Sequence, residues 1–219
     1  MTSETKILLS IGIITFLILG AGIFFFTKNT PISAPQSVAD AGVLIRDDSH
    51  KIATKSATIT LVEFGDYQCP SCAAAHTYVK QILSKFPANI NYVFRNFPLN
   101  IHQNALIGAE AAEAAGAQGK YWQMSDTLYD KQTEWGESSN PMEFFMKYAA
   151  DLKLDTTKFK QDINNNQYNN FIQKDLADGN AIGVNATPTF FINNQLYTSS
   201  YTDLPKTIET LVTSITPSP

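Results

Sequence analysis

The chain has two cysteines, Cys69 and Cys72, three positions apart at a change of pattern in the sequence. Residues 57–64 before them form a β-branched, almost continuously apolar run, which predicts a central strand covered on both faces. After them, apolar residues recur at helical spacing until Pro87. Pro70 stands where proline is favoured, at the first position of a helix. The pair is therefore predicted to open an amphipathic helix directly after a buried strand.

The remaining pattern predicts one α/β domain. A second strand at Ile90–Phe94 would close a βαβ unit with parallel strands and a right-handed crossover. Residues 101–182 are helical in pattern and predict an insertion of several helices. A hairpin at Thr189–Tyr197 and a last amphipathic helix at Asp203–Val212 follow. The predicted order is βαβ, a helical insertion, then ββα.

A cysteine pair at a helix start has the chemistry of a thiol–disulfide couple. Cys69 would meet unpaired backbone N–H groups and the positive end of the helix dipole, which stabilise a thiolate and lower the thiol pKa. Cys69 is the predicted nucleophile, and Cys72, one turn later, is placed to resolve a mixed disulfide on Cys69. The alternative is half of a zinc site, but zinc usually needs four ligands, and only His76 and His102 could help. We expect no metal.

Glu63 is an acid in an otherwise apolar strand, six residues before Cys69. Such a carboxyl should be shielded from water and tuned by its neighbours. The alternative is an edge-strand glutamate that points outward. Arg95 could be a partner for an acid, and His102 lies at the start of the insertion, but neither is included among the predicted site residues.

The N-terminal segment predicts a membrane anchor. Residues 7–26 are twenty positions without a charge and apolar on every face, long enough to span a bilayer. A cleaved signal peptide is the alternative, but its apolar region is typically about 7–15 residues and a small-residue cleavage site should follow closely. We expect residues 1–28 to be an uncleaved anchor, 29–50 a flexible linker, and 51–219 a folded domain outside the cytoplasm.

Composition limits the partners. The formal net charge is −4, and no basic cluster is present, so the sequence shows no nucleic-acid footprint. Apolar residues make up 44% of the chain, which supplies a core without a metal or disulfide staple. The domain is expected to be a soluble monomer apart from its anchor.

Residues 57–212 resemble the thioredoxin superfamily and, within it, the DsbA-like proteins. The resemblance rests on the order of its motifs: Glu63 in the first strand, Cys69-Pro70-Ser71-Cys72 at the next helix start, a long insertion, and Gly183–Phe190 before the final hairpin. It implies an α/β thioredoxin fold (βαβ–ββα) with a helical insertion, here preceded by an N-terminal transmembrane helix.

The resemblance also implies roles for individual residues. Pro188 would be a cis-proline facing the cysteines, and Thr187 beside it would hold an extended substrate by its backbone. A proline directly before an apolar strand must mark the start of that strand, which agrees with this placement. Glu63 would be a buried acid that handles protons for the cysteines.

The implied activity is thiol–disulfide exchange with the Cys69–Cys72 disulfide as the redox group and no other cofactor. The Pro70-Ser71 dipeptide is of the kind seen in the oxidising branch, so we expect a dithiol oxidase acting on unfolded or reduced exported proteins. A membrane partner of the DsbB or vitamin K epoxide reductase-like type would re-oxidise it. The alternatives are a disulfide reductase of the same fold and a tethered, non-catalytic binding module.

Overall fold

The computed structural model describes residues 39–215. The predicted membrane anchor at residues 1–28, and residues 29–38 of the predicted linker, lie outside the described residues. Between residues 39 and 215, none of the helices is both long enough and apolar enough to cross a membrane.

A βαβ unit carries the cysteines. The strands β2 (Ile59–Gly65) and β3 (Ile90–Asn96) are parallel neighbours, with Glu63 level with Phe94. They are joined by α3 (Pro70–Lys85), which begins with proline at its first turn, as the sequence predicts. The site therefore lies at the carboxyl end of the central strand β2.

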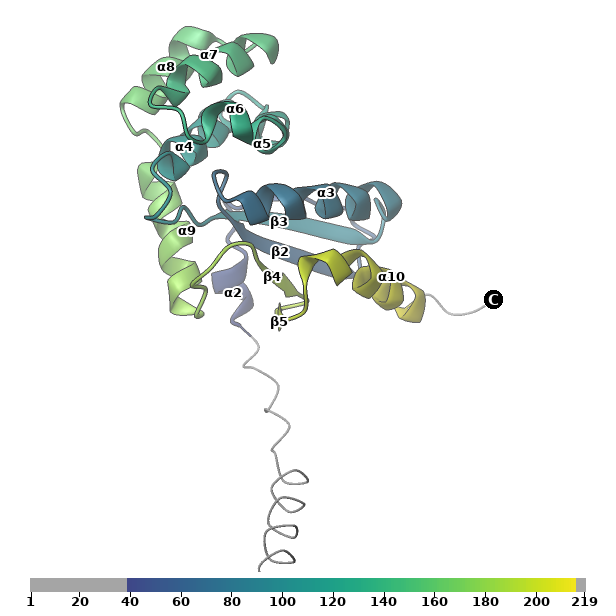
Figure 1. Ribbon diagram of the computed structural model, residues 1–219. Helices are drawn as coiled ribbons and strands as arrows, with labels where there is room; N and C mark the ends of the chain where they lie inside the picture. The colour runs from purple at the N-terminus through teal and green to yellow at the C-terminus, as the bar shows by residue number, and fades with distance from the viewer. Residues whose placement is uncertain (1–38, 216–219) are drawn as a thin grey trace, which may run out of the picture. The chain divides into compact units, whose positions relative to one another are not determined.

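The sheet is mixed and has five strands in the order β1-β3-β2-β4-β5 (Figure 1). The strand β4 (Thr189–Ile192) pairs antiparallel with β2, and β5 (Gln195–Tyr197) pairs antiparallel with β4, which is the predicted hairpin. A 3₁₀ turn at Tyr201–Asp203 leads into the last helix, α10 (Leu204–Ile215). The predicted βαβ then ββα order is confirmed.

Different helices cover the two faces of the sheet. The side chains of β2 alternate between the faces, as they must in a strand. Leu61 belongs to the core beneath α3 and α10, whereas Val62 and Phe64 belong to a second core on the opposite face. Glu63 shares the face of Leu61, so it points toward the helix that carries the cysteines.

The predicted insertion between β3 and β4 consists of helices joined by loops, and Figure 1 shows most of it gathered beyond one end of the sheet. Two of its helices pack closely at Gly108 and Trp135, where an added Cβ on Gly108 would lie 3.0 Å from the Trp135 ring. The small residues of the first helix therefore let the other helices approach closely. The helices are α4 (Ala105–Gly116), α5 (Tyr121–Asp130), α6 (Gln132–Trp135), α7 (Pro141–Asp151), α8 (Thr156–Asn164) and α9 (Asn169–Ala181).

The structure differs from the sequence-based expectation at residues 39–50, which were assigned to the flexible linker. This stretch contains the short helix α2 (Ala41–Leu44), whose Leu44 is fully buried, and it leads into β1 (His50–Ile52), an edge strand antiparallel to β3. The buried guanidinium of Arg95 donates hydrogen bonds to the carbonyl oxygens of Val43 and Leu44, at 2.7 and 2.6 Å. The folded domain thus begins earlier than predicted, because the carbonyl groups of its first turn accept hydrogen bonds from the buried guanidinium of Arg95.

Arg95 itself faces away from the cysteines. Its Nε donates to Asp175 Oδ1 of α9 at 2.7 Å, and Arg46 pairs with the same carboxylate at 2.9 Å. Asp178 accepts from both guanidinium groups. This network ties the N-terminal turn to α9, so Arg95 has a structural role on the face opposite the candidate site.

Gly65→Ala should destabilise the protein. An added Cβ would lie 2.5 Å from Phe94 Cε2 and 3.0 Å from Tyr129 Oη, with no room for either ring to move freely. Overpacking of this kind costs about 1–3 kcal/mol of unfolding free energy, which denaturant titration would measure. Gly42→Ala in α2 is the control, since its added Cβ meets only Asp40 Oδ1 at 3.4 Å. Equal stabilities of the two variants would contradict the prediction.

Candidate active site

The two cysteines lie at the start of α3, where Cys69 is the N-cap residue and Cys72 is in the first turn. Both are thiols in this structure. Cys69 retains 7% of its surface exposed, whereas Cys72 has none. The Cys69 thiol donates to the carbonyl oxygen of Thr187 at 3.4 Å, and Cys72 Sγ accepts from the N–H of Asp66 at 3.5 Å. Only Cys69 can therefore be reached by another molecule.

The surroundings of the two sulfurs shift their acidities in opposite directions. Hydrogen bonding from Cys72 lowers the pKa of Cys69 to about 5, and contacts with Thr187 and the N–H groups of Cys72 and Ser71 add to this, against the opposing effect of burial. Burial, the hydrogen bond to Cys69 and the nearby charge of Glu63 raise the pKa of Cys72 well above its ordinary value. At neutral pH Cys69 is a thiolate and Cys72 is a thiol.

The peptide bond between Thr187 and Pro188 is cis, as predicted. Pro188 directly precedes β4, whose first residue, Thr189, is level with Phe64 of β2. The loop therefore reaches the same end of the sheet as Cys69, and its Thr187 carbonyl contacts the Cys69 sulfur. Tertiary structure brings together two motifs that are 118 positions apart.

Glu63 is completely buried beneath the pair, which excludes the outward-pointing alternative. Its Oε2 accepts a hydrogen bond from Tyr92 Oη at 2.6 Å, and its Oε1 has no hydrogen-bond partner. Burial raises the pKa of Glu63 to about 7, while the Tyr92 hydrogen bond and the His76 charge act in the opposite direction. A carboxyl with this pKa can both take up and release a proton near neutral pH.

Asp66 organises the loop before the cysteines and was not among the predicted site residues. It is buried and accepts from the N–H groups of Gln68 and Leu99, at 2.8 and 2.9 Å. Its Oδ2 also lies 2.6 Å from His102 Nδ1. His102 therefore supports the loop and does not contact the sulfurs. An acid immediately after a buried strand was the available signal, but two of its partners, Leu99 and His102, follow it by more than thirty positions.

The insertion holds the same loop from the other side. Gln132 of α6 donates through Nε2 to the carbonyl oxygens of Tyr67 and Cys69, at 2.8 and 3.0 Å. Gln68 donates to the carbonyl of Gly136 at 2.6 Å and accepts from the N–H of Asn104 at 2.6 Å. No local pattern marks these glutamines, because their partners are backbone groups of distant segments.

The two histidines that a zinc site would need have other partners. His76 Nε2 lies 2.8 Å from Asp126 Oδ1, and His102 is paired with Asp66. Over residues 39–215, no group of three or more histidine, cysteine or acidic side chains is arranged to hold a metal ion.

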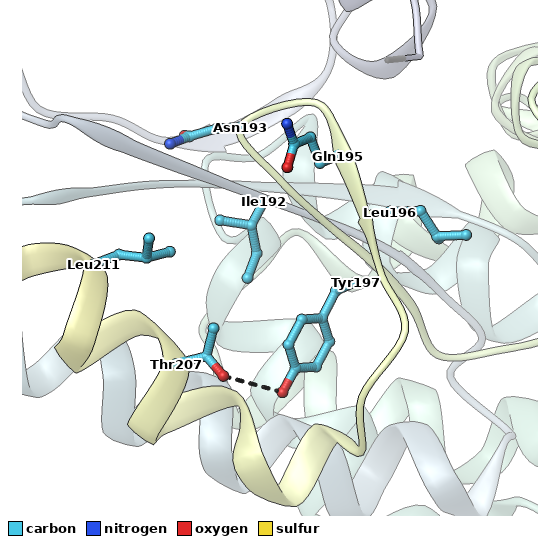
Figure 2. A pocket seen from close by; sticks show the side chains of 7 residues that line it. All are labelled: Ile192, Asn193, Gln195, Leu196, Tyr197, Thr207 and Leu211. Atoms are coloured by element: carbon cyan, nitrogen blue, oxygen red, sulfur yellow. Dashed lines mark hydrogen bonds between the residues drawn. The ribbon is translucent and has the colours of Figure 1, made fainter. Parts of the chain in front are cut away.

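A pocket of about 330 Å³ lies between the β4–β5 hairpin and α10 (Figure 2). Tyr197 Oη reaches across it to Thr207 Oγ1 at 3.4 Å. It includes Ile192, the last residue of β4, whereas Pro188 precedes the first, so this pocket is at the opposite end of the strand from the redox site. Its lining residues are Ile192, Asn193, Gln195, Leu196, Tyr197, Thr207 and Leu211.

Comparisons with known proteins agree with the fold. A family model described as Thioredoxin matches residues 46–210. A thioredoxin-like oxidoreductase from Silicibacter pomeroyi DSS-3 is 25% identical, with a TM-score of 0.65 over 80% of this chain and 99% of that one. BdbD from Bacillus subtilis is 21% identical, with a TM-score of 0.66 over 75% of this chain and 93% of that one. The last similarity concerns the fold alone.

Curated relatives include a protein named Na(+)/H(+) antiporter NhaA 1 from Salinispora arenicola, which is 36% identical over 156 residues. The match covers 71% of this chain and 23% of that protein. The chain thus spans about a quarter of the length of the curated relatives that it matches. The antiporter name describes those longer proteins.

The chain belongs to the thioredoxin superfamily, since the family model covers most of it. Its helical insertion and its structural neighbours, among them the thiol-disulfide exchange protein alpha-DsbA2 from Wolbachia pipientis, give it the fold of DsbA-like thiol–disulfide oxidoreductases.

Glu63→Gln should remove a pH dependence of stability. In the wild type, the Glu63 pKa is about 4.5 in the unfolded chain and about 7 in the folded one. Between these values only the unfolded chain has lost the proton, so the unfolding free energy falls as pH rises, by about 3 kcal/mol in total, and is constant above the upper value. Glutamine keeps the Tyr92 hydrogen bond and cannot ionise.

Denaturant titrations at several pH values would measure this difference, with the exposed Glu143→Gln as the control. We expect the advantage of Glu63→Gln over the wild type to grow between pH about 4.5 and about 7. An advantage that is the same at every pH would show that Glu63 ionises normally in the folded protein.

Proposed function

We propose that this protein is an extracytoplasmic thiol–disulfide oxidoreductase that acts as a dithiol oxidase on exported proteins. The observation that carries the proposal is the opposed acidity of the pair. Cys69 is a partly exposed thiol whose pKa is lowered to about 5, and Cys72 is a buried thiol whose pKa is raised. Only Cys69 can exchange with a substrate or a partner, and Cys72 resolves the mixed disulfide on Cys69 when the pair is re-oxidised.

The reaction begins from the Cys69–Cys72 disulfide. A substrate thiolate attacks Cys69 Sγ, the bond between the two cysteines breaks, and its electron pair goes to Cys72 Sγ, which takes a proton from Glu63. A second substrate thiolate then attacks the substrate sulfur of the mixed disulfide, and Cys69 leaves as a thiolate. The substrate loses two electrons and the cysteine pair gains them.

The direction of exchange follows from the state that the site stabilises. The hydrogen bonds that lower the pKa of Cys69 act on a thiolate, which exists only in the reduced protein. Stabilising the reduced form makes the disulfide form a stronger oxidant. This supports an oxidase over a reductase of the same fold. A non-catalytic binding module would have no use for a thiolate of this kind.

Substrate binding is assigned to the loop around Pro188. A substrate attached to Cys69 must lie against Thr187, since the Thr187 carbonyl contacts that sulfur at 3.4 Å. An extended peptide held there by main-chain hydrogen bonds would be bound without regard to its sequence. That suits an enzyme whose substrates are many unfolded or reduced chains. Pro70 and Ser71, exposed in the first turn of α3 beside Cys69, are assigned a supporting role in this site.

Ribonuclease refolding tests the activity. The wild type, in its disulfide form, should restore activity to reduced, unfolded ribonuclease faster than it reduces insulin in the presence of a thiol. Cys69→Ser should be inactive in both assays, because the attacked sulfur is missing. Cys72→Ser cannot form the Cys69–Cys72 disulfide, and it should accumulate mixed disulfides when Cys69 attacks a disulfide, since Cys72 is not there to resolve them. Faster insulin reduction would favour the reductase, and inactivity of the wild type in both assays would favour the binding module.

The proposal includes the location and the partner. We assign residues 1–28 to a single uncleaved anchor that tethers a monomeric domain outside the cytoplasm, where disulfides persist. A membrane oxidase of the DsbB or vitamin K epoxide reductase-like type would restore the Cys69–Cys72 disulfide after each turnover. Its reaction is the reverse exchange, in which Cys69 attacks and Cys72 resolves.

Cell fractionation tests this location. The full chain should be recovered with membranes, and protease added outside the cytoplasmic membrane should degrade the domain in intact cells or spheroplasts. A variant with Ile18→Lys and Leu19→Lys should be lost from the membrane fraction, because charges at the centre of a span oppose insertion by about 2.5–3.5 kcal/mol each. Recovery of a shortened wild-type protein in the soluble fraction would indicate a cleaved signal peptide instead.

A further inference from the structure

A cleft of about 240 Å³ opens between α3, β3 and α5, on the flank of the domain behind the cysteines. Two of its lining residues, Tyr92 and His76, also interact with the Glu63 carboxyl group. Tyr92 donates the 2.6 Å hydrogen bond to Glu63, and the charge of His76 affects the Glu63 carboxyl. The cleft therefore lies next to the buried acid but opens at a different place from Cys69.

His76 connects this buried region to the surface. It is on α3, one helical turn after Cys72, and its side chain is 9% exposed. Its Nε2 lies 2.8 Å from Asp126 Oδ1 of α5, and Asp126 is 48% exposed. The His76 ring also lies against the ring of Tyr129, at 4.8 Å between centroids, and Tyr129 Oη is buried without a hydrogen-bond partner. The imidazole thus stands between a polar interior and solvent.

Glu63 needs such a connection if the proposed function is right. It is fully buried, yet it must give up or take a proton each time Cys72 changes state. While a substrate or partner is attached to Cys69, that molecule covers the exposed side of the pair. A proton then has to pass on the other side of α3, where the cleft is.

We propose that His76 is a positioning residue that relays protons between Glu63 and solvent through this cleft, with Asp126 orienting its imidazole. This inference rests on the proposed function.

During re-oxidation, Cys69 is bonded to the partner's sulfur and Cys72 is a thiol. The Cys72 proton moves to the Glu63 carboxylate, and Cys72 Sγ attacks Cys69 Sγ. The partner's sulfur leaves with the electron pair of the broken bond. The Glu63 proton then passes to His76, which releases one to water, so Glu63 is again a carboxylate. The reverse sequence supplies the proton that Cys72 takes when a substrate is oxidised.

The alternative is that His76 only ties α3 to α5 through Asp126. Substitution separates the two roles. In His76→Gln, the amide can keep a hydrogen bond to Asp126 but cannot carry a proton at neutral pH. In His76→Ala, the lost ring leaves a space that added imidazole can enter from the cleft. If His76 only connects the two helices, His76→Gln should resolve the mixed disulfide normally. If His76 relays protons, only added imidazole should restore resolution, and only in His76→Ala.

The experiment uses the full-length reduced protein in detergent with glutathione disulfide. Acid quenching, alkylation and mass spectrometry separate two steps: formation of the mixed disulfide at Cys69, and its resolution by Cys72. In the wild type, resolution should become faster as pH rises through about 7, where Glu63 becomes a carboxylate. The groups that face Glu63 are Tyr92 from β3, Tyr67 from the loop, Cys69, Cys72 and His76 from α3, and Tyr129 from α5.

In His76→Gln, we expect the first step to be unchanged and resolution to be slower by about a hundredfold, at the lower end of what acid–base groups contribute. Its pH midpoint should move upward, since the His76 charge that favours the Glu63 carboxylate is gone. Imidazole at constant pH should accelerate resolution in His76→Ala only. His50→Gln is the matched control, because His50 forms a similar pair with Glu113 at 2.7 Å, away from the cysteines.

Resolution at the wild-type rate and with the wild-type pH profile in His76→Gln would overturn the relay while leaving the proposed function intact. Slow resolution in His76→Ala that glutamine restores and imidazole does not would do the same, in favour of the structural tie. If the wild type forms no mixed disulfide with glutathione disulfide, the proposed function fails, and the relay fails with it.

Discussion

The hydrogen bonds around the Cys69 sulfur are the interaction on which the site depends. They come from the first turn of α3 and from Thr187 beside Pro188, so a stable thiolate requires that both segments meet at the end of β2. The mixed sheet provides this meeting, because a helix that leaves β2 and an antiparallel strand that enters beside it share one edge. The acidity of Cys69 follows from that placement, and the proposed redox direction rests on it.

The rest of the domain maintains the difference in exposure and pKa between the two cysteines. Asp66 and Gln132 bind backbone groups of the loop before α3. Gln68 of that loop bonds in turn to the backbone of Gly136 and Asn104 in the insertion. Beneath the helix, Glu63 lies among tyrosines with one oxygen unpartnered. Leaving a buried polar atom without a hydrogen bond is costly, and such atoms concentrate where chemistry needs them. The same few residues therefore affect both the stability of the domain and the reactivity of the cysteines.

Much of the fold could be predicted from the sequence because its signals are local. The β-branched run before Cys69, Pro70 at the helix start and the apolar spacing on α3 each act within a few residues. The predicted linker was wrong at residues 39–50 for the opposite reason. The turn at α2 and the strand β1 are too short to have a period, and what orders α2 is Arg95, more than fifty positions later.

The sequence by itself determined the cysteine pair, its place at a helix start, and the acid six residues before it, since each is a matter of residue type and spacing. Only the tertiary structure decided that Glu63 is shut off from water, that Arg95 faces the opposite side of the sheet, and that His102 supports Asp66. Side-chain burial and pairing depend on elements that approach from distant parts of the chain. Local propensity does not tell which distant elements pack against a given side chain.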